Sequence, residues 1–224
     1  MKLNDVFLSI NGEINLFHQG SLCIFVRFQG CNMRCKWCDT PQAQEIDNGT
    51  EDVSIGQIIE KMNEVAPRCR KVTITGGEPL IHGKPMIDYI ESLLKRGYCV
   101  SVETNGSFPT RDWLHPEIRN HPNLSFVVDW KLPDSGMSQN MEIANFRTLT
   151  RKDFVKFVIS SRKDYDEAVR QMGMMALMQI PVTFAMSANT QAIMPRWELL
   201  EWMFADQIPA VFNFQLHKYL DGLK

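Results

Sequence analysis

Residues 30–41 read GCNMRCKWCDTP and place Cys31, Cys35 and Cys38 within eight residues, at the spacing C-x3-C-x2-C. A tetrahedral structural zinc site takes four ligands, usually from two C-x2-C pairs. The remaining cysteines form no second pair, because they lie within or next to apolar runs: Cys23, Cys69 and Cys99. Three thiolates suit a cluster of four irons better, since the fourth iron can stay open. The segment therefore predicts a 4Fe–4S cluster, and a zinc site completed by a histidine from elsewhere in the chain is the alternative.

The composition is that of an ordinary globular protein. The 224 residues are 44% hydrophobic and 22% charged, which predicts one domain, residues 1–224, and excludes disordered and low-complexity classes. A net charge of −2 does not indicate a nucleic-acid partner. The longest uncharged stretch, 171–195, is interrupted by polar residues and a proline, so no membrane span is expected. The N-terminus lacks the apolar centre of a signal peptide, and we expect a cytoplasmic protein with reduced thiols.

Short apolar runs alternate with amphipathic segments along the chain. Strands are expected at Cys23–Phe28, Lys71–Thr75, Cys99–Glu103, Ser125–Asp129, Phe154–Ile159, Pro181–Met186 and Val211–Leu216. Helices are expected at Ser54–Val65 (with Ser54 as N-cap), Pro85–Arg96, Lys163–Met178 and Pro195–Phe204. Strand–helix alternation with strands that are apolar throughout is typical of a parallel α/β sheet. Because a full eight-unit barrel takes about 250 residues, we expect an α/β fold with a partial (β/α)6-type TIM barrel.

Polar groups follow four of the expected strands at the point where each strand ends. Arg27 ends the first run, Thr75 the second, Glu103 the third and Asp129 the fourth. Reactive groups of parallel α/β sheets gather at the carboxyl ends of the strands. We therefore expect these side chains to share one rim with the cysteine loop, although Glu103 could equally cap a turn.

The cysteine spacing, with Trp37 before the last cysteine, resembles the radical S-adenosylmethionine superfamily, and so does the Gly-Gly-Glu-Pro segment at 76–79. The resemblance implies that the open iron of the cluster chelates S-adenosylmethionine and that reductive cleavage yields a 5′-deoxyadenosyl radical. An external electron donor such as flavodoxin or ferredoxin is then required. The cofactor-binding residues implied by the resemblance are Trp37, Cys38, Asp39, Gly76, Gly77, Asp129, Trp130 and Lys131.

A narrower set of motifs resembles the 7-carboxy-7-deazaguanine synthase family. The motifs are Ser9–Glu13, Phe25–Cys31, the Cys-Asp-Thr at 38–40 and the segment Gln215–Tyr219. The resemblance implies a carbon–nitrogen lyase of queuosine and deazapurine biosynthesis, which converts 6-carboxy-5,6,7,8-tetrahydropterin to 7-carboxy-7-deazaguanine with loss of ammonia. It implies substrate contacts from Ile10, Asn11, Gly12, Glu13, Arg27, Thr75 and His217, and magnesium binding by Thr40.

Two other functions remain open from the sequence. A glycyl-radical activating protein of the same superfamily shares the cluster loop and Gly-Gly-Glu-Pro but has no need of Arg27 for a pterin. A metal-bound structural or electron-transfer module predicts a stable metal without cleavage of S-adenosylmethionine. Seven strands in a short barrel leave an edge that pairing can cover, so we expect a homodimer.

Overall fold

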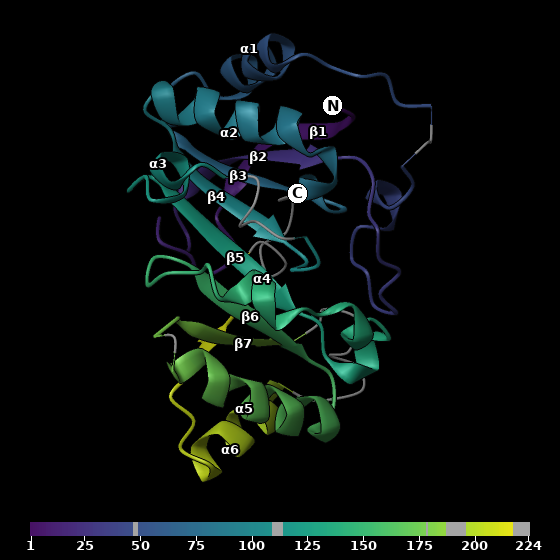
Figure 1. Ribbon diagram of the computed structural model, residues 1–224, viewed down its shortest axis with the longest axis vertical. Helices are drawn as coiled ribbons and strands as arrows, with labels where there is room; N and C mark the ends of the chain where they lie inside the picture. The colour runs from purple at the N-terminus through teal and green to yellow at the C-terminus, as the bar shows by residue number, and fades with distance from the viewer. Residues whose placement is uncertain (47–48, 109–113, 178, 187–195, 217–224) are drawn as a thin grey trace.

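Strands that are consecutive in the sequence are neighbours in one eight-stranded sheet, with the order β1 to β8 (Figure 1). The computed structural model describes residues 1–46, 49–108, 114–177, 179–186 and 196–216. Within these residues the strands are β1 Leu3–Ile10, β2 Leu22–Phe28, β3 Lys71–Gly76, β4 Cys99–Thr104, β5 Leu124–Trp130, β6 Phe154–Ile159, β7 Val182–Met186 and β8 Val211–Asn213. β1 pairs antiparallel with β2, and every later pair is parallel.

Helices cover the outer face of the sheet. Among the described residues they are α1 Ile55–Val65, α2 Lys84–Lys95, α3 Pro116–Arg119, α4 Ile143–Phe146, α5 Arg162–Leu177 and α6 Arg196–Ala205, with 3-10 turns η1 Pro41–Ala43, η2 Pro79–His82, η3 Pro133–Ser135 and η4 Ser138–Asn140. Figure 1 shows α1 and α2 beside the first strands and α5 and α6 beside the last ones. In the described parts of the β4–β5 and β5–β6 crossovers, α3 and α4 have four residues each.

The predicted (β/α)6-type partial barrel is confirmed. From β2 to β8, each strand pairs in parallel with the next strand in the sequence, which gives six parallel pairs. Strand β6 has the predicted bounds, and the others differ by one or two residues except at the C-terminal end. There β8 ends at Asn213 instead of Leu216. Ser54 caps α1 as predicted, accepting a hydrogen bond from the backbone N–H of Gln57 in a reciprocal capping box.

Strand β1 was not predicted. Asn4 and Asp5 near its start are unfavourable in strands, so its sequence has no clear strand signal. It forms because its neighbour β2 is buried and offers a long antiparallel register, from Leu3 beside Phe28 to Ile10 beside Leu22. The consequence is that the chain leaves β1 at the amino end of β2, away from the cysteine loop.

The loop 11–21 then returns across the open side of the barrel to β8. The backbone N–H of Ile14 donates to Asn213 Oδ1 at 3.1 Å, and Leu216 N–H donates to the carbonyl of Gly12 at 3.3 Å. Gln19 Nε2 donates to the Phe214 carbonyl at 2.5 Å. These bonds join the two ends of the sheet and carry Glu13 inside. No helix in the described part of the chain is long and apolar enough to cross a membrane.

Candidate active site

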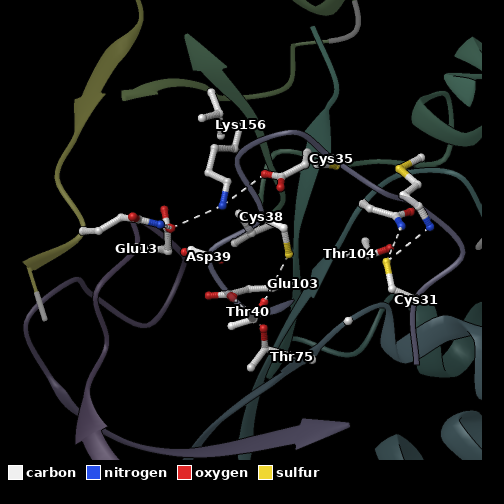
Figure 2. Close-up of a pocket in the computed structure, with 18 of the residues that line it drawn as sticks. Glu13, Cys31, Cys35, Cys38, Asp39, Thr40, Thr75, Glu103, Thr104 and Lys156 are labelled. Carbon is white, nitrogen blue, oxygen red and sulfur yellow. Dashed lines mark hydrogen bonds and ion pairs between the residues drawn. The ribbon is translucent and has the colours of Figure 1, made fainter. Parts of the chain in front are cut away.

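One pocket is lined by strands β2 to β7 and by the segments that follow β1, β2, β3, β4, β5 and β8 (Figure 2). Side chains alternate along a strand, so neighbouring residues tend to face opposite sides of the sheet. On β5, Val127 and Asp129 line the pocket, whereas Val128 and Trp130 belong to the core under the helices. Most of the site residues expected from the sequence line it: Gly12, Glu13, Arg27, Cys31, Cys35, Trp37, Cys38, Asp39, Thr40, Thr75, Gly76, Gly77, Asp129 and Lys131.

The three thiols of the cysteine loop all reach this pocket. Burial raises the pKa values of Cys31 and Cys35, so without a metal these two thiols keep their protons. The described residues contain no group of three or more His, Cys, Asp or Glu side chains placed around a single ion. A cluster of four irons holds its thiolates further apart than one ion does. Three thiols around one cavity, without a fourth cysteine or a histidine among the described residues that line it, therefore fit a 4Fe–4S cluster better than zinc.

Gly76 and Gly77 let the loop after β3 pack directly on the cysteine loop. A Cβ on Gly77 would lie 2.3 Å from the carbonyl oxygen of Gly30 and 2.5 Å from that of Ala43. A Cβ on Gly76 would lie 2.3 Å from the carbonyl oxygen of Phe28. Only glycine avoids these overlaps with backbone, which a side chain elsewhere cannot relieve. Both glycines also line the pocket, so its wall here is main chain without side chains, which a cofactor can approach closely.

Glu78 fastens the same loop to the end of β4. Its side chain is fully buried and accepts hydrogen bonds from Leu80 N–H at 3.0 Å, Thr104 Oγ1 at 2.8 Å and Asn105 N–H at 2.6 Å. Burial raises the pKa of Glu78 to about 7, although the three donors partly offset this. Since Glu78 does not line the pocket, its role is structural support.

Buried charges cross the pocket from β5 and β6 to the loop after β1. Lys131 Nζ lies 2.7 Å from Asp129 Oδ2, and Lys156 Nζ lies 3.1 Å from Asp129 Oδ1. Burial opposes the charge of Asp129, but the two ammonium groups outweigh it and hold its pKa below the usual range. Lys156 also lies 3.2 Å from Glu13 Oε1. Burial alone would lower the pKa of Lys156, whereas Asp129, Glu13 and Glu103 hold it well above its usual value.

Arg27, Thr75 and Glu103 form the side of the pocket made by β2, β3 and β4. Thr75 Oγ1 donates to Glu103 Oε2 at 2.9 Å, so Glu103 faces the pocket and does not cap a turn. Burial raises the pKa of Glu103 to about 7, and Lys156 offsets part of that effect. The Arg27 guanidinium lies 5.7 Å from the ring centroid of Phe7 and has no acidic partner among the described residues. A cation of this kind is suited to an anionic ligand.

Thr40 follows the last cysteine of the loop and precedes η1. Its side chain makes no capping hydrogen bond to that turn, and its Oγ1 lies 3.9 Å from Cys38 Sγ. Thr40, Asp39 and Trp37 all line the pocket. The hydroxyl oxygen of Thr40 is thus placed beside the cluster ligand, where a hard cation could use it.

Three expected site residues do not line the pocket. Trp130 packs against Phe146 with 4.7 Å between ring centroids, because the alternation that directs Asp129 inward directs its neighbour outward. Asn11 exchanges amide hydrogen bonds of 2.9 Å with Asn15 and so shapes the loop itself. Ile10 is the last residue of β1, paired with Leu22. His217 lies outside the described residues.

Sequence reasoning missed Lys156, which lines the pocket, and Asn213, which does not line it but binds Glu13. Lys156 interrupts the apolar run FVKFVI of β6, and a charge inside a buried strand was the available signal. Asn213 Nδ2 donates to Glu13 Oε2, and Gln215 Nε2 donates to Glu13 Oε1 at 2.7 Å. Asn213 carried no such signal, since an amide at a strand end is common.

Comparison with known proteins assigns the chain to a family. A family model of the radical SAM superfamily matches residues 25–124. A 7-carboxy-7-deazaguanine synthase of Clostridium acetobutylicum is 39% identical over 75% of this chain and 72% of its own length. One of Koribacter versatilis is 31% identical over 98% of this chain and 96% of its own. The chain belongs to the 7-carboxy-7-deazaguanine synthase family. The QueE crystal structure from Escherichia coli has the same fold, with a TM-score of 0.69, 20% identity, and coverage of 95% of this chain and 93% of that one.

Family membership establishes the class of chemistry. The chain is a lyase of the radical SAM superfamily, with a 4Fe–4S cluster and S-adenosylmethionine as cofactors. The relatives do not favour a glycyl-radical activating protein. The thiols of Cys31, Cys35 and Cys38 and the glycine backbone beside them are the features of this chain that fit those cofactors.

Proposed function

We propose that the protein converts 6-carboxy-5,6,7,8-tetrahydropterin to 7-carboxy-7-deazaguanine with loss of ammonia, a step of queuosine and deazapurine biosynthesis. One observation carries the proposal. The pocket that receives the three thiols of the cysteine loop also contains Arg27, whose guanidinium has no acidic partner among the described residues. A cofactor half and an anion-binding half thus share one space.

The residues of the pocket divide between these halves. When bound, the cluster and S-adenosylmethionine supply the radical that removes a hydrogen atom from the pterin carbon bearing the carboxylate. We assign to the cofactor half the residues Trp37, Cys38, Asp39, Gly76, Gly77, Asp129 and Lys131, together with the ligands Cys31 and Cys35. We assign to the substrate half Gly12, Glu13, Arg27 and Thr75, and to magnesium the hydroxyl of Thr40.

Charged groups of the substrate half would recognise the carboxypterin. Arg27 presents a planar set of donors to the substrate carboxylate, the arrangement that guanidinium groups form most strongly. Glu13, held by Lys156, Asn213 and Gln215, offers carboxylate oxygens to N–H donors of the pterin ring. A magnesium ion at Thr40 would bind a substrate carboxylate oxygen as well, because a hydroxyl alone is a weak ligand.

The proposal extends to the partners of the enzyme. An external one-electron donor of the flavodoxin or ferredoxin type reduces the cluster, and the enzyme works in the cytoplasm. It acts as a homodimer: β1 has β2 as its only strand partner among the described residues, apart from an isolated bridge between Lys2 and Asp52. A second copy that covers this edge would remove an exposed row of backbone donors and acceptors. Sedimentation of the reconstituted enzyme tests the dimer.

Anaerobic reconstitution with iron and sulfide, followed by incubation with the carboxypterin, S-adenosylmethionine, magnesium and a reductant, tests the function. The expected result is 7-carboxy-7-deazaguanine and ammonia in equal amounts, identified by mass spectrometry and an ammonia assay. Reactions without S-adenosylmethionine and with Cys38→Ala are the controls. Cofactor cleavage without any pterin product would reject the proposed substrate. Stoichiometric zinc without cofactor cleavage would point to a structural metal module.

A further inference from the structure

Lys156 is a charged side chain in the middle of an otherwise apolar strand. The residue is 7% exposed, and its Nζ lies 3.2 Å from Glu13 Oε1 (Figure 2). The same Nζ lies 3.1 Å from Asp129 Oδ1, a carboxylate on a different element. A buried ammonium group is costly unless it is paired, and these two contacts provide that pairing. Lys156 therefore links the loop after β1 to the end of β5.

The two carboxylates depend on Lys156 to different degrees. Asp129 has a second cationic partner, Lys131, at 2.7 Å. The other described partners of the Glu13 carboxylate are the neutral amides of Asn213 and Gln215. Among the described residues, Lys156 is thus the one cation that forms an ion pair with Glu13. Loss of Lys156 would leave Glu13 buried, 3% exposed, without a counter-charge.

We propose that Lys156 is a positioning residue for the substrate, which holds the Glu13 carboxylate at the pterin subsite and joins it to Asp129 in the cofactor half of the pocket. The inference rests on the function proposed above, which assigns the pterin to Glu13. Because Asp129 keeps Lys131, the effect of removing Lys156 falls on the substrate side. Lys156 need not touch the pterin itself.

A double-mutant cycle tests this role through binding, without turnover. Dissociation constants for the carboxypterin and for S-adenosylmethionine are measured by calorimetry on anaerobically reconstituted enzyme without reductant. Lys156→Met keeps the length of the side chain and removes its charge. It should weaken pterin binding about ten- to a hundredfold and change S-adenosylmethionine binding by less than about threefold, since Lys131 still pairs with Asp129. Glu13→Gln should weaken the pterin as well, and the double variant should be no weaker than the weaker single variant.

Lys152→Met is the matched control. Lys152 precedes the same strand and is partly buried, but it donates to the carbonyls of Arg119 and His121, at 2.9 and 2.6 Å, and does not line the pocket. Both affinities should remain at wild-type values in this variant. A general loss of packing around β6 would weaken both ligands in Lys156→Met, whereas a positioning role weakens the pterin selectively.

Three results would overturn the proposal. The first is wild-type pterin affinity in Lys156→Met, and the second is an equal loss of affinity for the pterin and for S-adenosylmethionine. The third is a double variant whose loss of pterin affinity equals the product of the losses in the two single variants. If Lys156→Met alone does not retain its cluster, the double variant Glu13→Gln, Lys156→Met tests the proposal instead, because glutamine at position 13 leaves no unpaired buried charge. It should then match Glu13→Gln in pterin affinity, and a weaker affinity would refute the role. Failure of the wild-type enzyme to bind the carboxypterin would instead reject the proposed function and this inference with it.

Discussion

The backbone N–H of Asn105 donates a 2.6 Å hydrogen bond to Glu78 Oε2, and this bond joins the loop after β3 to the loop after β4. The side chain of Asn105 in turn donates to Asn32 Oδ1 at 2.9 Å and lies 3.9 Å from Cys31 Sγ. The fully buried carboxylate of Glu78 thus supports both the start of the cysteine loop and the glycine wall, by which we mean the part of the pocket wall formed by Gly76 and Gly77. It does so without entering the pocket.

The charge of Glu78 makes the folded protein sensitive to pH. Its pKa is about 7 in the folded chain against a usual value of 4.5, so the folded state binds the proton more tightly than the unfolded state. The stability that protonated Glu78 contributes is complete below pH 4.5 and is lost as pH rises through 7. Glu78→Gln has no such titration. Relative to this variant, the free energy of unfolding of the wild type should increase by up to about 3 kcal/mol as pH falls from 7 to 4.5. Anaerobic urea unfolding at several pH values measures the difference, and a constant difference across this range would contradict the raised pKa.

Cluster content should depend on Cys31, Cys35 and Cys38 alone among the cysteines. A 4Fe–4S cluster contributes about four iron atoms per chain, and alanine at any of these positions should reduce the iron content well below that value. The reason is that no other described thiol lines the pocket. Alanine at the other three cysteines should leave iron unchanged: Cys23, Cys69 and Cys99. Iron and sulfide analysis after anaerobic reconstitution measures this. Cluster loss in one of the latter three variants would show that the ligand set is different.

Arg27→Lys should weaken carboxypterin binding by about ten- to a hundredfold, since an ammonium group keeps the charge but loses the paired donors of the guanidinium. The slow cleavage of S-adenosylmethionine without substrate should continue, because the cysteine loop and the glycine wall are unchanged. Calorimetry and a 5′-deoxyadenosine assay measure the two quantities. Abolished cofactor cleavage with unchanged pterin affinity would move Arg27 to the cofactor half.

Thr40→Val should remove the dependence of turnover on magnesium while the cluster remains intact. Valine has nearly the same shape as threonine and lacks only the hydroxyl, which makes no capping bond in η1 that could be lost. Rates with magnesium and with a chelator, compared between variant and wild type, give the result. Wild-type turnover that is the same under chelation would refute the assignment of Thr40.

Much of the site could be predicted because its signals are local. The cysteine spacing and the two glycines before Glu78 each lie in one short segment whose chemistry is readable without a partner. Trp130 shows the limit of this reading. It is adjacent to Asp129 in the sequence, but strand alternation places the two side chains on opposite faces of the sheet.

The sequence by itself determined the parallel α/β architecture and the cysteine loop, because strand periodicity and ligand spacing are properties of neighbouring residues. Tertiary structure alone decided how the buried charges pair. Glu13 and Lys156 are 143 residues apart, and Glu13 and Asn213 are 200 apart. A lysine inside an apolar strand must find a partner, since burial of an unpaired charge is too costly, but its sequence does not say which carboxylate that is. The return of loop 11–21 across the open side of the barrel makes that choice, because it brings Glu13 to the ammonium group of Lys156.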